Sequence, residues 1–214
     1  RRIALGGKAA FDPGRNVFHQ QTAIGLACAS CHPEGRDDGL TWNFAQFGAR
    51  RTQSLAGNIL DRAPYHWAGD EATLPKLMDD VFSTRMAGGT LTDNEKAALG
   101  PWMNRIPAPP AGVVNTDAAA RGAVLFDQSG CNSCHAAGVN GIFTNNQLVN
   151  VGTGGKFKVP SLAGVAARAP FMHDGCAKTL MDRFTTCGGG DLHGATSALS
   201  QTQLTDMVEY LESL

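Results

Sequence analysis

The sequence predicts a mainly all-α protein made of two repeated helical units, with long loops between short helices. The first observation is a Cys-x-x-Cys-His pattern that occurs once in each half of the 214 residues. The second is a high content of loop-forming residues, 26 Gly and 10 Pro, which favours turns over long strands. The third is a pair of capping boxes, Thr92 to Glu95 and Ser200 to Gln203, each of which marks the start of a helix.

The composition excludes several classes of protein. Hydrophobic residues make up 43% of the chain and charged residues 17%, which excludes a disordered chain. The 18 basic and 19 acidic residues leave a net charge of −1, so we expect no nucleic-acid partner. No apolar run approaches the ~20 residues of a transmembrane helix. The start, Arg1-Arg2-Ile3, lacks the apolar region of a signal peptide, so we expect an exported chain after processing or part of a longer chain.

The two cysteine patterns predict covalent attachment of two c-type haems. Two thiols one helical turn apart reach the two vinyl groups of one porphyrin, and the next imidazole binds its iron. A redox dithiol, a zinc site built from both pairs and two local disulfides are the alternatives, but none requires His after the second Cys in both copies. We call residues 28–32 and 131–135 the haem frames. Their predicted attachment residues and proximal ligands are Cys28, Cys31, His32, Cys131, Cys134 and His135.

Sequence around the two frames repeats as well. Short helices are expected just upstream of each frame, at 14–18 and 120–126. Downstream, Ala-Pro-Tyr-His-Trp-Ala-Gly at 63–69 corresponds to Ala-Pro-Phe-Met-His-Asp-Gly at 169–175, and both lead into a helix. The chain therefore contains a duplicated unit.

The ends of the two units are also predicted from pattern. Apolar residues at helical spacing define a closing helix in each half: Leu99, Trp102, Met103 and Ile106 in the first, and Leu204, Met207, Val208 and Leu211 in the second. Gly100-Pro101 should kink or restart the first of these helices. The Pro-rich stretch 106–112 is a stiff linker, which places the units at 1–110 and 111–214. Residues 136–160 are expected to form a long loop over the second haem.

The motifs together resemble the bacterial di-haem cytochrome c peroxidase and MauG superfamily over nearly the whole chain. They are Arg-Arg-Thr-Gln-Ser-Leu at 50–55, Gly-Lys-Phe-Lys-Val-Pro-Ser-Leu at 155–162 and the 169–175 segment. The resemblance implies two cytochrome-c-like domains, each enclosing one haem, in a periplasmic or extracellular protein. It also implies a small cytochrome or copper protein as electron donor and peroxide or a related oxidant as substrate. Residues 1–7 resemble the end of a β-propeller blade that precedes this module in some members, with an ordinary strand or coil as the alternative. Calcium between the domains has no support in the sequence.

The first half departs from the family at its peroxide site. Arg85 stands where the family has its catalytic acid, and an Arg stabilises negative charge but does not accept the peroxide proton. Residues 33–48 also offer no counterpart of the family's distal His. Met86 and His66 are the candidate sixth ligands of the first haem, with buried packing as the alternative for each.

The second half departs from the family at its sixth ligand. Cys187 stands where the family has Met or Tyr, so it is either a thiolate ligand or the partner of Cys176 in a disulfide. Since exported proteins rarely leave two nearby cysteines free, we expect the disulfide. His193 is then the preferred sixth ligand, with Met172 and an open site as alternatives and a surface histidine as a further one.

Three more residues are candidates for a role beside the haems. Trp42 is expected either between the porphyrins, where it assists electron transfer, or in the core. Arg50 and Arg51 are expected to pair with haem propionates or with surface carboxylates. The function expected is a peroxidase-like oxidoreductase. The alternative is a di-haem electron carrier or a module of a larger assembly, which the missing acid favours.

Overall fold

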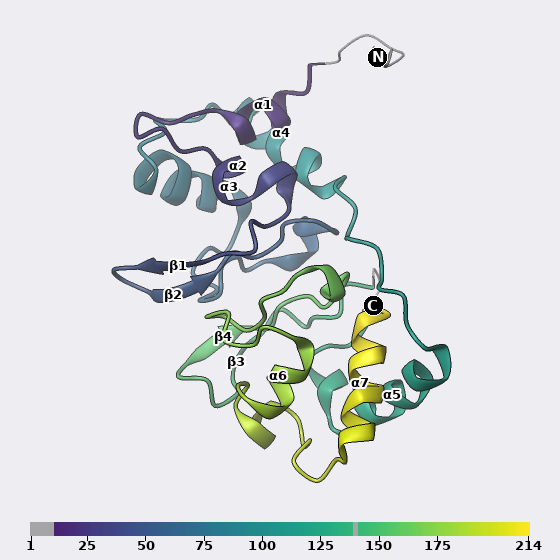
Figure 1. Ribbon diagram of the computed structural model, residues 1–214. Helices are drawn as coiled ribbons and strands as arrows, with labels where there is room; N and C mark the ends of the chain where they lie inside the picture. Colours follow the sequence, from purple (N-terminus) through teal and green to yellow (C-terminus); the bar gives the residue numbers. More distant parts are fainter. Residues whose placement is uncertain (1–10, 139–140) are drawn as a thin grey trace, which may run out of the picture.

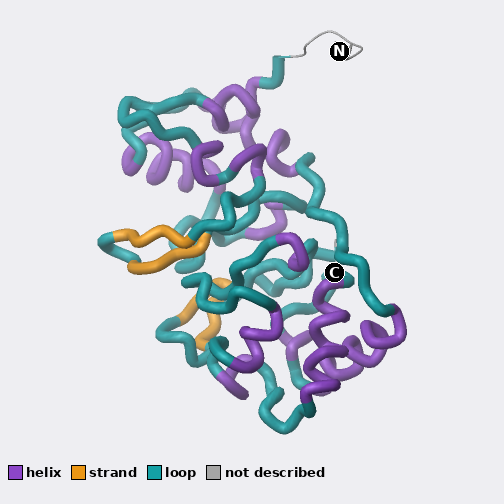
Figure 2. Tube along the Cα trace, in the orientation of Figure 1, coloured by secondary structure: helices purple, strands orange, loops and turns teal. Residues whose placement is uncertain are grey.

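The computed structural model describes residues 11–138 and 141–214, which are mostly helix and loop (Figures 1 and 2). The expected end of a propeller blade at 1–7 lies outside the described residues. The longer helices are α1 (Pro13–His19), η3 (Met78–Arg85), α4 (Asp93–Asn104), α5 (Thr116–Gln128), α6 (Leu180–Thr185) and α7 (Gln201–Glu212). Short helices are α2 (Cys28–Cys31), α3 (Leu74–Leu77), η1 (Pro33–Gly35), η2 (Ile59–Arg62), η4 (Cys131–Ser133), η5 (Val165–Ala167) and η6 (Gly190–His193). None of the described helices is long and apolar enough to cross a membrane.

The predicted helix starts are confirmed. Thr92 accepts a hydrogen bond from the backbone N–H of Glu95, and Ser200 accepts one from that of Gln203. Of the two outcomes expected at Gly100-Pro101, the restart is wrong, because α4 continues through both residues. Gly100 lets the side chains of Leu60 and Leu74 pack close to the helix backbone. Burial of the apolar face therefore outweighs the hydrogen bond that Pro101 cannot donate.

Two separate apolar clusters form the core. The first is built from residues between Val17 and Ile106, and the second from residues between Phe126 and Leu214. No helix or strand lies in residues 107–115, which connect α4 to α5 along one side of the molecule (Figure 1). Each cluster contains one pair of packed helices: α1 lies against α4 in the first cluster, and α5 lies against α7 in the second.

A glycine lets the two helices of each pair approach closely. A Cβ atom on Gly14 of α1 would lie 2.4 Å from the carbonyl oxygen of Ala98 in α4. A Cβ atom on Gly122 of α5 would lie 2.0 Å from the carbonyl oxygen of Asp206 in α7. Both distances are far below van der Waals contact, so no larger residue fits unless the helices separate.

Two short antiparallel ribbons lie between the helix groups (Figure 1). They are β1 (Thr41–Phe44) with β2 (Gly48–Arg51), and β3 (Leu148–Asn150) with β4 (Lys156–Lys158). The second ribbon corrects the expectation that 136–160 is only a loop. Each ribbon bonds to the other half through its backbone: the N–H of Arg51 donates to His173 at 2.8 Å, and that of Lys158 donates to Trp67 at 2.8 Å. The ribbons therefore join the two halves.

We predict that Gly122→Ala destabilises the protein. Helix propensity alone would favour Ala by about 1 kcal/mol, but the clash with Asp206 should cost about 1–3 kcal/mol. The midpoint of urea unfolding measures the difference. Ala120→Ser, at an exposed position of the same helix, is the control and should change stability by less than about 0.5 kcal/mol. A gain in stability for Gly122→Ala would contradict the close packing of α5 on α7.

Candidate functional site

Both haem frames border one cavity of about 790 Å³, which we call the shared cavity; its lining includes Cys28, His32, Cys131 and His135. The two frames have the same local geometry. The N–H of His32 donates to the carbonyl of Cys28 at 3.0 Å, and that of His135 donates to the carbonyl of Cys131 at 2.9 Å. One turn thus presents two thiols and an imidazole to the cavity in each half. None of the four frame cysteines forms a disulfide.

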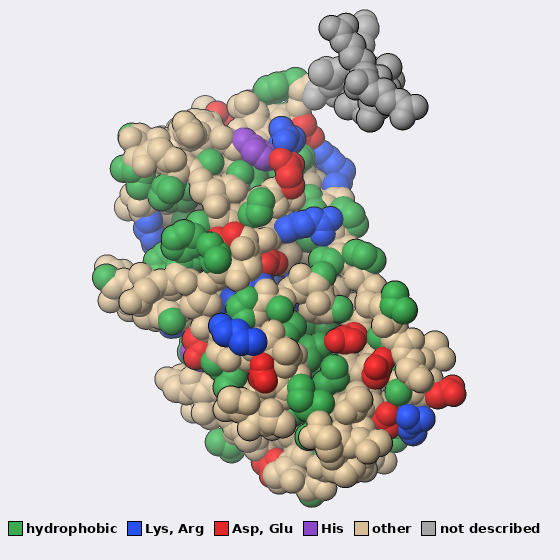
Figure 3. Space-filling model, viewed as in Figure 1, with side chains coloured by type: hydrophobic (Ala, Val, Ile, Leu, Met, Phe, Trp, Pro, Cys, Tyr) green, Lys and Arg blue, Asp and Glu red, His purple; other side chains and the backbone are tan. Residues whose placement is uncertain are grey.

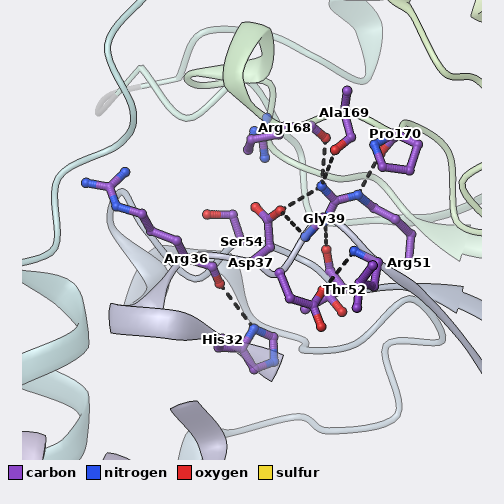
Figure 4. Close-up of polar contacts among 12 residues, drawn as sticks. His32, Arg36, Asp37, Gly39, Arg51, Thr52, Ser54, Arg168, Ala169 and Pro170 are labelled. Atoms are coloured by element: carbon purple, nitrogen blue, oxygen red, sulfur yellow. Dashed lines mark hydrogen bonds and ion pairs between the residues drawn. The ribbon is translucent and has the colours of Figure 1, made fainter. Parts of the chain in front are cut away.

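The frame histidines are held in the form that binds metals. Nδ1 of His135 lies 3.1 Å from the carbonyl of Phe143, and Nδ1 of His32 lies 3.3 Å from that of Arg36 (Figure 4). A carbonyl only accepts, so Nδ1 carries the proton and Nε2 keeps its lone pair. Burial lowers the pKa of His135 to about 4 and also lowers that of His32. Both rings are therefore neutral near pH 7.

The charge of the cavity lining is strongly unbalanced. Among its Asp, Glu, Lys and Arg residues, Asp70 is the single acid, against Arg50, Arg51, Arg62, Arg85, Lys158, Arg168 and Arg183. The remaining lining is largely apolar. A porphyrin has an apolar face and two anionic propionates, so thiols, neutral imidazoles, apolar walls and excess positive charge all fit covalently bound haems.

A second histidine lies opposite His135. The ring centroids of His135 and His193 are 6.5 Å apart. Two imidazoles that share one metal ion at about 2.0–2.1 Å from nitrogen place their centroids roughly 6.4 Å apart. His193 is held like His135, with Nδ1 3.0 Å from the carbonyl of Gly188. Burial, together with the charges of Arg183 and His135, lowers the pKa of His193 to about 3, so this ring too is neutral.

The segment that carries His193 is shaped by a disulfide and glycines. Cys176 and Cys187 form a disulfide with an S–S distance of 2.03 Å, so Cys187 is not a thiolate in this structure. Gly189 follows Cys187 by two residues, and a Cβ atom on it would lie 1.6 Å from the carbonyl oxygen of Val151. Only glycine allows the chain to pass there and return toward the cavity. Met172, the other candidate in this half, also lines the shared cavity.

His66 in the first half occupies the position equivalent to Met172. Both residues have a left-handed backbone, with φ of 65° at His66 and 70° at Met172, and both line the shared cavity. Side chains with a Cβ rarely adopt this conformation, and such strain is concentrated at functional sites. Nδ1 of His66 lies 3.0 Å from a carboxylate oxygen of Asp70. That contact fixes the ring and leaves Nε2 as its second functional nitrogen.

Arg85 forms ion pairs with two carboxylates that the sequence motifs did not indicate. Its Nη2 lies 3.2 Å from Glu71 and 3.5 Å from Asp70. Lys76 pairs with Glu71 from another side at 2.9 Å. Their position in the sequence could have indicated them, because Asp70-Glu71 directly follows the repeated 63–69 segment. Although burial opposes it, the nearby His66 and Arg85 keep the pKa of Asp70 below its ordinary value. Because Arg85 and Lys76 neutralise these carboxylates, we assign no metal ion to the His66, Asp70 and Glu71 group.

Among the described residues, no second histidine ring faces His32 in the way that His193 faces His135. Within the described residues no ring contact involves His32. Met86, the other candidate, follows η3 directly, is half-buried and lines the shared cavity. The two halves therefore differ in the groups available at the sixth position.

Trp42 is not in the core, which was one of the two positions expected for it. It is in β1 with 42% of its surface exposed, and its Nε1 donates to Asp38 at 2.9 Å. It borders the shared cavity. The half-buried Trp67 also borders the cavity, with its ring centroid 6.4 Å from that of His173, which stacks on Phe157 at 3.8 Å.

Arg51 links the halves instead of pairing at the surface. It is 5% exposed, forms an ion pair with Asp37 at 2.7 Å, and donates to the carbonyls of Arg168 and Pro170 at 2.8 and 2.6 Å (Figure 4). These partners use its donors, so the expected propionate contact is not needed to satisfy them. The guanidinium of Arg50 lies over the ring of Phe157 at 5.3 Å from the centroid and also borders the cavity.

Comparison with known sequences finds a family match in the second half of the chain. Residues 119–214 match the family described as Cytochrome c. A segment of 75 residues is 39% identical to hydrazine synthase subunit gamma of Kuenenia stuttgartiensis. This segment covers 35% of the chain and 21% of that relative, so the similarity spans about a fifth of the relative's length.

Solved structures share the fold over nearly the whole chain. Hydrazine synthase of Kuenenia stuttgartiensis has a TM-score of 0.82 at 22% identity, covering 94% of this chain and 86% of that one. A MauG-like protein associated with microbial copper homeostasis has a TM-score of 0.69 at 19% identity, covering 100% and 91%. A variant of the diheme peroxidase BthA from Burkholderia thailandensis has a TM-score of 0.56 at 14% identity, covering 93% and 84%. The second half of the chain is thus a cytochrome c domain, and the chain as a whole has the fold of MauG-like proteins and di-haem peroxidases, as its motifs indicate.

Proposed function

We propose that the protein is a di-haem c-type oxidoreductase that passes electrons between two haems and reduces peroxide or a related small oxidant. Residues 1–110 and 111–214 each hold one haem, through the attachment and proximal residues of their own frame. The observation that carries the proposal is the opening of both frames into one cavity with a large excess of positive charge. The haems, when bound, supply the one-electron chemistry that no side chain provides.

The second site stores and relays an electron. The ring centroids of His135 and His193 are 6.5 Å apart, a spacing that fits one metal ion between them, and both rings are neutral. Two nitrogen ligands from these rings would leave no position for an oxidant. The disulfide between Cys176 and Cys187 supports this role because it removes the competing thiolate and fixes the residue from which the segment leading to His193 starts.

The first site binds the oxidant. His66 borders the cavity, and Asp70 orients its ring through Nδ1. This pair supplies the proton-transferring group that Arg85 cannot provide. Arg85 acts on the carboxylates instead, since it holds Asp70 and Glu71 in place. Proton movement at Nε2 of His66 is the step that this chain's own residues perform.

An electron carrier is the second candidate. Met86 and His66 both border the cavity at the first frame, and either one as a sixth iron ligand would close that site. The protein would then be a module of a larger electron-transfer assembly, of the kind that the partial similarity to a hydrazine synthase subunit suggests.

The proposed location is outside the cytoplasm. The Cys176–Cys187 disulfide supports an oxidising compartment, since such bonds are rare in reducing ones. A periplasmic or extracellular place fits a small cytochrome or copper protein as the electron donor.

Replacing His193 with Ala should remove one ligand from the second haem only. The electron-spin spectrum of the oxidised wild type is expected to show a low-spin signal from this haem, and the variant a new high-spin signal for one haem per chain. His19→Ala is the control, since His19 pairs with Glu34 and is not among the residues that line the shared cavity. An unchanged spectrum in His193→Ala would remove His193 from the iron and leave Met172 as the candidate.

Replacing His66 with Ala should slow peroxide reduction by roughly 10²–10⁴-fold, which is the usual contribution of general acid–base catalysis. Asp70→Asn should retain part of the rate, because the ring loses its orientation but keeps its nitrogen. The measurement is steady-state peroxide consumption with a reduced donor, together with the spin state of the first haem. A wild-type first haem that is low-spin and becomes high-spin in His66→Ala would show that His66 is an iron ligand, which favours the carrier.

A further inference from the structure

Two arginines occupy the same position in the two repeats. Arg62 directly precedes the 63–69 segment, and Arg168 directly precedes 169–175. Both side chains border the shared cavity, and Lys158 of β4 borders it as well. We call Arg62, Lys158 and Arg168 the cation cluster. The first of these residues belongs to one half of the chain and the other two belong to the second half.

Arg62 and Lys158 of the cation cluster are buried, and Arg168 is half-buried. Arg62 is 5% exposed and Lys158 is 4% exposed. Within the described residues, no carboxylate forms an ion pair with any of the three. The guanidinium of Arg62 donates to backbone carbonyls that include Ser54, and Arg168 donates to Ser161 at 2.6 Å. The Nε of each arginine is buried without a hydrogen-bond partner.

Arg62 also repels the other two cations of the cluster. Burial lowers the pKa of Lys158 to about 8, and the charge of Arg62 adds to the effect. Burial and the charge of Arg62 lower the pKa of Arg168 to about 10. Burial lowers that of Arg62 to about 10, offset in part by Asp61. Buried like charges of this kind are costly unless an anion is supplied.

Two other cations of the cavity lining already have carboxylate partners. Arg51 is paired with Asp37, and Arg85 with Asp70 and Glu71. On the surface shown in Figure 3, basic and acidic side chains are intermixed. The uncompensated charge is therefore concentrated inside the molecule, where the two halves meet.

The geometry points to a single anion site in which Arg62, Lys158 and Arg168 bind the propionates of both haems. This inference rests on the proposed two-haem function and identifies the residues that couple the two haems. An electron that reaches either iron is then stabilised by the same three positive charges. Removing one cation should therefore make both haems harder to reduce, although each haem belongs to a different half.

The test is an optical redox titration of the holoprotein in which the two haems are resolved. Lys158→Met and Arg62→Met should each lower the ratio of ferrous to ferric iron at a fixed potential by about tenfold for both haems, which is a shift of 59 mV for a one-electron couple. Lys156→Met is the matched control, since it removes the same charge from the same strand at an exposed position. It should change either ratio by less than about twofold, because water and salt screen it. Arg62→Lys and Lys158→Arg should restore the wild-type ratios.

A shift at one haem alone, or at neither, would overturn the shared site. If a Met variant fails to incorporate both haems, Lys158→Gln and Arg62→Gln provide the same comparison with a polar side chain. Haem content of the wild type, measured from intact mass, separates the two proposals. A wild type with fewer than two haems contradicts the proposed function, whereas two haems with independent potentials contradict only the shared anion site.

Discussion

The constraint on which the structure depends is positive charge enclosed between the two halves. An apolar cavity bordered by seven Arg and Lys side chains and one carboxylate is unfavourable by itself. The same lining suits groups that are apolar at their centre and anionic at one edge. The fold around the cavity therefore makes physical sense with haems in it. The overall net charge of −1 gave no sign of the site, because acidic residues elsewhere in the chain balance these cations.

Arg51 shows how one of these charges is compensated. It pairs with Asp37 from its own half and donates to carbonyls at 168–170 in the other half. Its burial costs little, because every partner is a carboxylate or a backbone oxygen. The backbone bonds of Arg51 and Lys158 to the opposite half add to the same contact. The junction of the two halves is thus polar and specific, and it lies beside the haem frames.

Duplication followed by divergence explains the unequal sites. The 63–69 and 169–175 segments form the same strained turn, which points a side chain at the cavity from each half. The first presents His66, with Asp70 behind it. The second presents Met172, and there the disulfide and glycine segment brings His193 opposite His135. One backbone geometry therefore places different side chains at the cavity in the two halves.

The sequence by itself determined the elements that depend on neighbouring residues. Helix starts, the apolar stripes of α4 and α7, the two haem frames and the duplicated segments all follow from local spacing, and the resemblance they indicate is confirmed. Local spacing also has limits: Pro101 was expected to kink or restart α4, but the helix continues through it, with Leu60 and Leu74 packed against Gly100. The tertiary structure decided what depends on distant residues. Arg85 is held by Asp70 and Glu71, Trp42 is exposed, and Arg62, Lys158 and Arg168 all border one cavity. Charge interactions act through space and not along the chain, so residues a hundred positions apart combine only once the two halves have folded against each other.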